Sequence, residues 1–292
     1  MKQIVIITHR HHYHICQVAI LLAIKQFNPD KITIVFDEVS GTEQGWLDLG
    51  EKLLTDLKKI YNFKPGSIFA IPFSSLSDVP NESYGWIRQQ LVKLNLHKIL
   101  SGDEWLVIDG DTLINYPIDP WKYCYINPGD MLHLHHDFFV RYTLNLGDQR
   151  VFYNNNPVEF SSVPIRLLSR SVLESLEKYV YELHGTTVKG IRDSFTLKKD
   201  RDKYIELSEF DLICNYQYFI TKDLLPLENI PIAYCPKEEL ITNWENLKNI
   251  VTVLHGKDNL PAEWYHQFGI TINQNMWDLI YPNQKINCNS NL

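Results

Sequence analysis

Short apolar runs alternate with amphipathic segments through the first 115 residues of the chain. The runs are apolar or β-branched at successive positions, as in strands buried on both faces, and fall at residues 4–8, 32–36, 67–72 and 105–108. Segments with apolar side chains at helical spacing lie between them, at residues 15–27, 50–61 and 86–100. Strands separated by helices of this length predict parallel βαβ units. We therefore expect an α/β fold with a mostly parallel central sheet flanked by helices.

The second half of the chain has a less regular pattern. It predicts strands at residues 123–125, 138–143, 151–153 and 250–254, and helices at residues 169–183 and 209–219. Ser169 and Ser208 stand where N-caps of these two helices would be. No internal repeat or low-complexity linker interrupts the chain. We expect residues 1–120 and 121–292 to be two halves of one continuous domain, the second half being mixed α and β.

Polar residues follow three of the predicted strands. Thr8, Asp37 and Asp109 each stand where a strand of the parallel sheet ends. Ligands of open α/β sheets bind beyond this carboxyl edge. Three polar residues at three strand ends therefore favour a nucleotide pocket at that edge.

The tripeptide Asp109-Gly110-Asp111 puts two carboxylates at the end of an apolar strand. Side chains at i and i+2 of an extended segment point the same way, so these carboxylates can converge on one point. Two converging carboxylates repel each other unless a cation lies between them, and Mg²⁺ and Mn²⁺ prefer oxygen ligands. A solvated Asp-Gly-Asp turn is the alternative for the tripeptide taken alone.

Composition limits the class of protein. The chain has 292 residues, of which 45% are hydrophobic and 12% aromatic, as is ordinary for a globular protein. Its net charge of −7 provides no overall basic field for nucleic acid or anionic lipid. No run approaches the roughly 18 apolar residues of a membrane helix, and the N-terminus enters a strand without a signal-peptide core. Five scattered cysteines without a CxxC pair indicate reduced thiols in a cytoplasmic protein, or in the host cytoplasm if the protein is viral.

Four stretches of the chain resemble a known family. They are residues 8–16, the Gly-Trp-x-x-Gln-Gln-x-x-Lys run at 85–93, the Asp-x-Asp at 109–111, and the Ser-Glu-Phe-Asp at 208–211. Together they resemble nucleotide-sugar glycosyltransferases of the GT-A type, and more narrowly the glycosyltransferase-like family catalogued mainly as a domain of unknown function. Each piece alone is a weak signal, but the combination in this order is specific.

The resemblance implies a metal-dependent transferase whose donor is a nucleoside-diphosphate sugar, a UDP-sugar being the expected one. It implies that Asp109 and Asp111 hold Mn²⁺ or Mg²⁺ and that His255 is a third ligand. The family's His-x-x-Gly context is altered here, because Gly256 follows the histidine at once.

The resemblance also implies which residues contact the donor. These are Thr8, Arg10, Tyr13, Asp37, Gln89, Gln90, Lys93, Gly110 and Lys257. Gln90 and Lys93 are three residues apart and share a helix face, so an amide and an ammonium can reach the donor sugar or phosphate together. A solvent-facing helix surface is the alternative for these residues.

Glu209 and Asp211 are the candidate catalytic carboxylates. In an inverting transferase, one of them would be the general base that deprotonates the acceptor hydroxyl. In a retaining transferase, it would position the acceptor or stabilise the transition state. The two side chains diverge by roughly 200° on a helix, so only one can face the site; Glu209 is favoured, with Asp211 in reserve. The alternative is that both are acids of a first helical turn behind the Ser208 cap.

The acceptor side is less well defined. His135, His136 and Asp137 lie where an acceptor would enter the resembled fold, and a zinc site is disfavoured because consecutive side chains diverge whereas zinc ligands converge. The acceptor is either a glycan or a hydroxymethylated base in DNA, as in bacteriophage DNA modification. Two other classes stay open. One is a nucleotidyltransferase, which usually has a glycine-rich loop that residues 8–13 lack. The other is a non-catalytic protein that binds nucleotide sugars or carbohydrates.

Overall fold

A computed structural model describes the chain at residues 1–9, 12–37, 43–60, 66–76, 85–127, 134–196, 207–236, 251–255, 260, 262–266 and 268–270. By its internal contacts the chain divides into two units. Unit 1 comprises Met1–Ser75, Val107–Ile118 and Pro231–Leu292, and unit 2 comprises Leu76–Leu106 and Asp119–Ile230. The chain passes from one unit to the other after Ser75, Leu106, Ile118 and Ile230. The division into halves at residue 120 stays a prediction.

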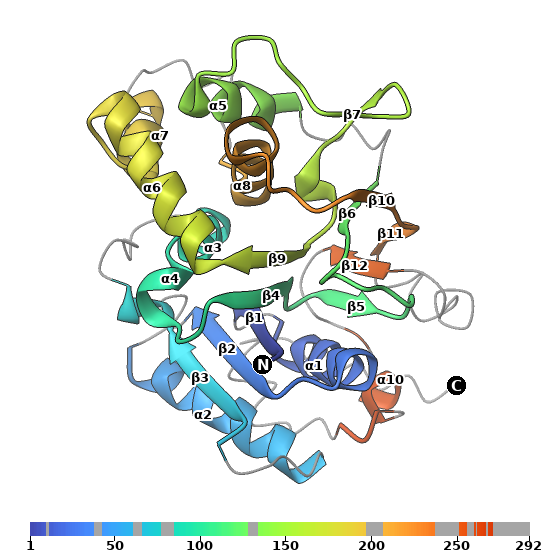
Figure 1. Ribbon diagram of the computed structural model, residues 1–292. Helices are drawn as coiled ribbons and strands as arrows, with labels where there is room; N and C mark the ends of the chain where they lie inside the picture. The colour runs from blue at the N-terminus through green and yellow to red at the C-terminus, as the bar shows by residue number, and fades with distance from the viewer. Residues whose placement is uncertain are drawn as a thin grey trace. The chain divides into compact units, whose positions relative to one another are not determined.

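Unit 1 is built on a parallel sheet (Figure 1). Its elements are β1 (Gln3–His9), α1 (Tyr13–Phe27), β2 (Lys31–Asp37), α2 (Glu43–Ile60), β3 (Ile68–Pro72), η2 (Phe73–Ser75), the second half of β4 (Glu104–Asp109), β5 (Thr112–Ile114), β11 (Ile232–Pro236), β12 (Val251–His255) and α10 (Ala262–His266). The strand order is β3-β2-β1-β4, and β2 pairs in parallel with both β1 and β3. The predicted α/β class, with a mostly parallel sheet flanked by helices, is confirmed.

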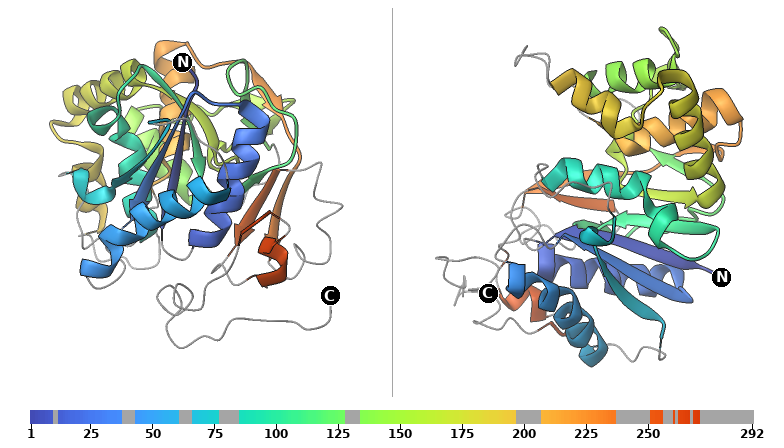
Figure 2. Two further views of the ribbon diagram at one scale, coloured as in Figure 1. Left: turned by 90° about the horizontal axis from the view of Figure 1, so that it is seen from below. Right: turned by 90° about the vertical axis from the view of Figure 1, so that its left-hand side faces the viewer.

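Burial explains why an uninterrupted apolar run makes the central strand. The four side chains at positions 4–7 of β1 point alternately to the two faces of the sheet, and each is at most 1% exposed. Only a strand covered on both faces requires apolar residues at every position. Figure 2 shows α1 and α2 on the same face of this sheet, as two right-handed crossovers in one direction require. In α2, Leu53 and Leu57 are four residues apart on the buried side.

A second, three-stranded sheet belongs to unit 1. Its order is β11-β12-β5, with β11 parallel to β12 and β12 antiparallel to β5. Leu113 of β5 shares an apolar cluster with Ile15 and Val18 of α1 and with Trp264 and Tyr265 of α10. This cluster ties the C-terminal part of the described chain to its first helix, and it fixes β12 beside the segment that follows β4.

Unit 2 is mostly helical. Its elements are α3 (Gly85–Leu94), α4 (Leu96–Ile99), the first half of β4, β6 (Cys124–Ile126), α5 (Leu134–Leu144), β7 (Phe152–Tyr153), β8 (Asn156–Pro157), η3 (Phe160–Ser162), β9 (Ile165–Ser169), α6 (Arg170–His184), α7 (Val188–Thr196), α8 (Glu209–Tyr216), η4 (Gln217–Thr221) and β10 (Leu227–Asn229). Here β9 is the neighbour of β4, β10 pairs in parallel with β6, and β7 and β8 form a hairpin.

Both predicted N-caps in this unit are confirmed. The Ser169 hydroxyl accepts a hydrogen bond from the Val172 N–H at the start of α6, and the Ser208 hydroxyl accepts one from the Asp211 N–H at the start of α8. Each bond satisfies one of the N–H groups that a first helical turn leaves without an intrahelical partner. The helix predicted at residues 209–219 is present as α8 and its π-helical continuation η4.

The strand predicted at residues 138–143 is wrong, because this segment lies in α5. Its aromatic and β-branched residues have high strand propensity, but tertiary packing overrides that preference. The buried positions are 139, 140, 143 and 144, whereas Phe138 and Tyr142 are 50% and 47% exposed. Burial therefore recurs at helical rather than at alternating spacing, and two aromatic rings are left on the surface.

The helix predicted at residues 86–100 is two helices. The chain leaves α3 at Asn95, whose side-chain amide donates to the Leu91 carbonyl at 2.8 Å, and α4 follows at Leu96. An asparagine that bonds to the carbonyl four residues back competes with the helical backbone, which explains the break.

Two expectations from composition can be set beside the structure. Among the described residues, no helix is long and apolar enough to span a membrane. Three of the cysteines, Cys16, Cys124 and Cys214, are buried and free.

His14 is a buried titratable side chain on α1. It is 2% exposed, and its ring lies 5.2 Å from the Tyr13 ring and 5.5 Å from the Tyr265 ring, measured between centroids. Burial lowers the pKa of His14 to about 4, and the nearby carboxylate of Asp56 on α2 only partly opposes this effect. The folded protein therefore holds His14 neutral where an unfolded chain would protonate it.

We expect the stability of the protein to fall as the pH drops from about 6.5 toward 4, by up to about 1.4 kcal/mol per pH unit from His14 alone. In this window the unfolded chain binds a proton at His14 and the folded protein does not. His14→Gln removes that titration, so its free energy of unfolding, from urea denaturation, should depend less on pH between 6.5 and 4. Variant and wild type should run parallel between pH 7 and 8. Equal slopes in the acidic window would contradict the assignment.

Candidate functional site

The Asp109-Gly110-Asp111 turn lies at the carboxyl edge of the parallel sheet in unit 1. Asp109 is the last residue of β4, and β5 begins at Thr112 directly after Asp111. The Gly110 N–H donates to the Ile7 carbonyl of β1 at 2.7 Å. This backbone bond holds the turn against the end of the neighbouring strand. Both carboxylates are partly exposed, as a pair that meets a ligand must be.

Gly110 is required because the turn passes very close to Thr8. A Cβ atom on Gly110 would lie 2.5 Å from the Thr8 hydroxyl oxygen and 2.6 Å from the Thr8 Cβ. No real side chain tolerates such distances, so only glycine fits between the two aspartates. The Thr8 hydroxyl therefore faces the turn, and it is buried without a hydrogen-bond partner among the described residues.

The end of β2 lies beside the same edge. Asp37 is opposite His9 in the parallel register of β1 and β2, and it is 2% exposed. His12, in the turn that starts α1, places its Nδ1 atom 3.8 Å from an Asp111 carboxylate oxygen, and its ring lies 4.0 Å from the His9 ring. The structure thus gathers Thr8, Asp37 and the two aspartates at one edge, as the sequence predicted from strand ends.

The end of β12 approaches this turn through its backbone. In the antiparallel pairing of β12 with β5, Val253 is opposite Thr112. This pairing ends at Val253, two residues before His255, the last residue of β12. The role of His255 as a third ligand stays a prediction; its side chain lies outside the described residues, as do Arg10 and Lys257 entirely.

The donor set of the turn fits a hard divalent cation. Mg²⁺ typically binds through one or two carboxylates, together with waters and substrate phosphates. Within the described residues, no three His, Cys, Asp or Glu side chains are grouped so that they could hold a metal by themselves. The aspartate pair is thus suited to a cation that a bound diphosphate helps to coordinate.

Tyr13, one of the predicted donor contacts, is buried and bonds to another helix of unit 1. Its side chain is 1% exposed, and its hydroxyl donates to an Asp56 carboxylate oxygen of α2 at 3.0 Å. Burial and the Asp56 charge both raise the pKa of Tyr13, so the hydroxyl keeps its proton. In this structure Tyr13 joins α1 to α2.

Unit 2 contains a buried ion pair that the sequence motifs include. The Lys93 Nζ atom of α3 lies 2.7 Å from a Glu209 carboxylate oxygen of α8, and the two side chains are 1% and 2% exposed. The same ammonium lies 4.5 Å from the centre of the Phe210 ring. Removing water from two charges is costly, and here each charge compensates for the other.

Gln90 completes this cluster. It is buried on the same face of α3 as Lys93, one turn earlier, and its side-chain oxygen accepts the Glu209 N–H at 3.3 Å. The predicted sharing of a face by Gln90 and Lys93 thus brings both to the N-terminus of α8, rather than to solvent. Gln89, next along the helix, is half-buried.

Asp211 makes a separate network. One carboxylate oxygen accepts the Phe160 N–H at 2.5 Å and the Ser161 N–H at 3.3 Å, and the other accepts the Ser208 hydroxyl at 2.6 Å. Arg166 lies alongside and donates to the carbonyls of Ile165 and Phe160. Glu209 and Asp211 therefore do diverge, one toward α3 and the other toward η3, and Asp211 is engaged in holding backbone.

The acceptor-side residues His135, His136 and Asp137 lie in the first turn of α5. Their side chains are outside the description. One residue beside the Asp109-Gly110-Asp111 turn was not among the predicted site residues: His12, whose Nδ1 atom lies 3.8 Å from an Asp111 carboxylate oxygen. It stands within residues 8–16, and no local pattern distinguishes it there from the neighbouring histidines.

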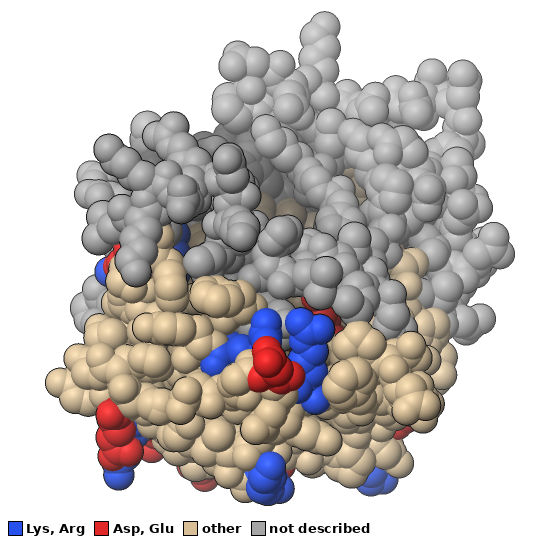
Figure 3. Space-filling model, turned by 90° about the horizontal axis from the view of Figure 1, so that it is seen from above, with Lys and Arg blue, Asp and Glu red and all other residues tan. Residues whose placement is uncertain are grey.

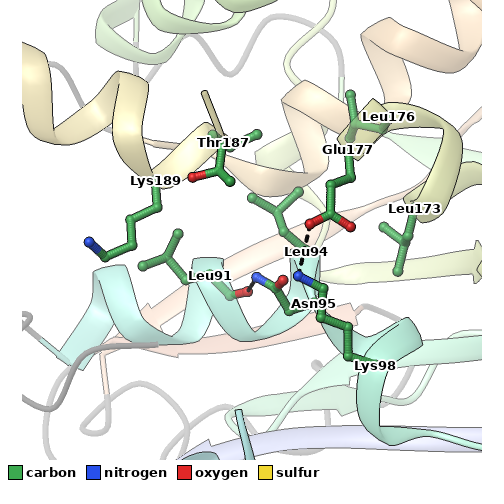
Figure 4. A pocket seen from close by; sticks show the side chains of 10 residues that line it. Leu91, Leu94, Asn95, Lys98, Leu173, Leu176, Glu177, Thr187 and Lys189 are labelled. Atoms are coloured by element: carbon green, nitrogen blue, oxygen red, sulfur yellow. Dashed lines mark hydrogen bonds and ion pairs between the residues drawn. The ribbon is translucent and has the colours of Figure 1, made fainter. Parts of the chain in front are cut away.

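A cavity of about 390 Å³ in unit 2 lies between α3 and α6 (Figure 4). Leu91 and Leu94 face it from α3, and Leu173 and Leu176 face it from α6. At its wall, Lys98 and Glu177 form an ion pair at 2.8 Å. None of the predicted site residues lines this cavity. Different residues of α3 thus line the cavity and form the Lys93–Glu209 cluster.

Comparisons with known proteins give likenesses in structure but not in sequence. No protein-family model and no curated protein matches the chain. The galactosyltransferase LgtC, in complex with donor and acceptor sugar analogs, aligns with a TM-score of 0.45 and 11% identity, over 95% of this chain and 99% of that chain. The inositol-1-phosphate CTP transferase from T. maritima aligns with a TM-score of 0.42 and 9% identity, over 92% and 95%. The glycosyltransferase GlyE of Streptococcus pneumoniae TIGR4 has a TM-score of 0.40 and 12% identity, over 96% and 62%. Because these TM-scores are below 0.5, we base the functional proposal on the residues of this chain.

We expect Lys93→Met to lower the free energy of unfolding by about 3–5 kcal/mol, because it leaves the buried Glu209 charge without compensation. The double variant Lys93→Met with Glu209→Leu should recover most of that loss, since no unpaired charge is left. Urea denaturation of the wild type, both single variants and the double variant gives the coupling energy directly.

Lys98→Met is the matched control. It breaks an ion pair of similar length, 2.8 Å, whose side chains are 32% and 42% exposed, and should cost about 1 kcal/mol or less. Two results would contradict the prediction: an equal loss of unfolding free energy in Lys93→Met and Lys98→Met, or a double variant as unstable as Lys93→Met. Either would show that burial does not strengthen the dependence of Glu209 on Lys93.

Proposed function

We propose that this protein is a metal-dependent glycosyltransferase of the GT-A type, which moves a sugar from a nucleoside-diphosphate sugar to a hydroxyl acceptor. The observation that carries this proposal is the Asp109-Gly110-Asp111 turn. It is held against the end of β1 by the Gly110 N–H, and Asp37 lies at the same carboxyl edge of the sheet. Two carboxylates at this edge are the ligands expected for a diphosphate-bound cation.

The chemistry that a bound Mn²⁺ or Mg²⁺ would supply is neutralisation of the diphosphate as it leaves the sugar. The residues of this chain would hold the cation and orient the nucleotide. Asp109 and Asp111 would hold the cation, with His255 as the third ligand. Thr8 presents a hydroxyl toward the same turn, and together with Asp37 it would contact the nucleotide. Arg10, Lys257 and Gln89 remain proposed donor contacts.

Glu209 is the proposed carboxylate of the reaction. Its backbone N–H and its side chain are fixed by Gln90 and Lys93, so the carboxylate is oriented before any substrate binds. Lys93 supplies the positive charge that faces this carboxylate in the folded protein. Because the side chain is 2% exposed, the proposal requires that its packing opens when substrate binds. Asp211 is set aside because three donors already occupy its oxygens.

The donor is proposed to be a UDP-sugar, and the acceptor a glycan or a hydroxymethylated base in DNA, entering near His135, His136 and Asp137. A nucleotidyltransferase is the rival that shares the sheet and the carboxylates, and its substrate would be a nucleoside triphosphate. A nucleotide-sugar-binding protein is the non-catalytic rival. The released product separates the three classes. A transferase releases a nucleoside diphosphate, a nucleotidyltransferase releases inorganic pyrophosphate, and a binding protein releases neither.

With Mn²⁺ present, one member of a panel of nucleotide sugars should raise the thermal stability of the protein and be slowly hydrolysed to the nucleoside diphosphate. At a donor concentration about 100 times the dissociation constant, the stabilisation should be about 2.7 kcal/mol. Asp109→Asn and Asp111→Asn should each abolish the part of the response that depends on Mn²⁺. Thermal denaturation with and without chelator, together with assay of released nucleotide, measures both effects.

Asp30→Asn serves as the control, because Asp30 is an exposed acid that accepts only from the Lys2 N–H in the described contacts. If no nucleotide sugar produces a response, the transferase proposal fails. If both turn variants respond to donor and Mn²⁺ as the wild type does, the proposed metal site fails.

Glu209→Gln and Asp211→Asn should differ in their effect on turnover. Glu209→Gln should reduce donor hydrolysis per folded molecule by about 10²–10⁴-fold, the usual contribution of a positioned acid or base. Asp211→Asn should mainly lower the melting temperature, because it removes the negative charge that strengthens the bonds from the Phe160 and Ser161 N–H groups and replaces the oxygen that accepts the Ser208 hydroxyl with an NH₂ group, and should leave hydrolysis per folded molecule nearly unchanged. Rates are taken below both melting temperatures, with the folded fraction measured by circular dichroism. The reverse pattern would assign the catalytic role to Asp211.

A further inference from the structure

An open groove of about 660 Å³ lies on the outer side of α5 in unit 2. Phe138, Arg141 and Tyr142 of α5 line it, together with Asn145 and Asp148 from the following loop and His184 at the end of α6. Phe138 and Tyr142 are 50% and 47% exposed. Large aromatic side chains this open to solvent and next to each other are unusual in a protein surface that binds nothing.

The rings of the groove form an ordered row. The Tyr142 ring lies between the rings of Phe138 and His184, at centroid distances of 6.4 and 5.3 Å and with interplanar angles of 22° and 25°. Phe195 of α7 meets Tyr142 edge-on, with centroids 5.0 Å apart. His184 is fixed further, because its Nε2 atom donates to the Thr143 carbonyl at 3.0 Å. Rings that are already held in place lose little conformational entropy when a ligand binds.

Polar groups border these rings. The Tyr142 hydroxyl, the Asn145 amide and the Asp148 carboxylate are all in exposed residues around the groove. The negative face of an aromatic ring attracts the polarised C–H groups on the face of a sugar ring, while hydroxyls around the sugar need hydrogen-bond partners. Half-exposed aromatic rings with polar groups at their border match both needs.

Charge distinguishes a sugar from a nucleic acid as the occupant. Arg141 is the one lysine or arginine among the lining residues, and it donates to Asp148 at 2.9 Å and to the Gly147 carbonyl at 3.1 Å. Its charge is therefore compensated, whereas a groove for nucleic acid needs cations that pair with phosphates. On the face shown in Figure 3, the charged side chains of the described residues are few and of both signs.

The groove is separate from the Lys93–Glu209 cluster. The buried side of α5 packs against α8, which begins with Glu209, and Phe138 and Tyr142 stand four residues apart on the exposed side of α5. A ligand in the groove would thus lie on the side of α5 that faces away from α8. Such a position suits the holding of a long acceptor, and not the reacting sugar.

We propose that the Phe138–Tyr142 groove is a carbohydrate-binding platform that holds a neutral stretch of glycan by stacking sugar rings on its row of aromatic rings. The claim that this glycan is the acceptor rests on the proposed transferase function. The binding itself can be tested without donor or metal.

The test is binding of the wild-type protein to an array of neutral and anionic glycans, followed by calorimetry with the neutral oligosaccharide that binds best. Phe138→Ala and Tyr142→Ala should each weaken that binding at least tenfold. Phe138→Leu should weaken it as well, because leucine keeps apolar bulk but has no ring face. Phe152→Ala, at an aromatic residue of β7 that is 56% exposed and outside the groove, should bind as the wild type does.

Three results would overturn the platform. They are the absence of binding to any arrayed glycan, wild-type affinity in both Phe138→Ala and Tyr142→Ala, and tighter binding of a single-stranded DNA oligonucleotide that the same variants abolish. Circular dichroism and the melting temperature establish that each variant is folded; the half-exposed Phe138 can be removed without opening the core. If the protein responds to a nucleotide sugar but binds no glycan, the platform proposal fails and the transferase proposal stands. If it binds glycan but responds to no nucleotide sugar, the transferase proposal fails and the platform proposal stands.

Discussion

The close approach of two backbone segments is the constraint on which the candidate site depends. The turn after β4 passes so near Thr8 that no side chain fits at Gly110, and the Gly110 N–H bonds to the end of β1. An aspartate therefore stands on either side of a fixed glycine, at the edge where the parallel strands end. One glycine thus positions the pair of aspartates at the end of the sheet, directly before β5 begins.

The alternating half of the fold was predictable because each element there is defined by a local pattern. In β1 every position is buried on one face or the other, so the apolar run in the sequence is the burial pattern itself. The prediction of a strand in the α5 segment was wrong for the opposite reason. Its propensity favours a strand, and only the contact with α8 decides which of its residues are covered. Residues that look alike in the sequence, such as Phe138 and Phe139, end on opposite sides of one helix.

The candidate site divides in the same way. Strand ends indicated the edge at which Thr8, Asp37 and Asp109 meet, because parallel strands bring their carboxyl ends together. Spacing on a helix indicated that Gln90 and Lys93 share a face, but it could not show that this face meets Glu209. Long-range pairs of this kind join positions more than a hundred residues apart, and no local pattern encodes them.

The two sets of charged residues follow different physical rules, and this difference bears on their roles. The carboxylates of the turn in unit 1 are partly exposed, and their mutual repulsion is relieved best by a ligand that brings positive charge. Lys93 and Glu209 in unit 2 are enclosed and compensate each other's charge, so neither needs a ligand to be stable where it lies. Under the proposed function the two sets would therefore act differently. The partly exposed pair could take up a cation together with a charged donor, whereas the packing around the enclosed pair would have to open before Glu209 met a substrate.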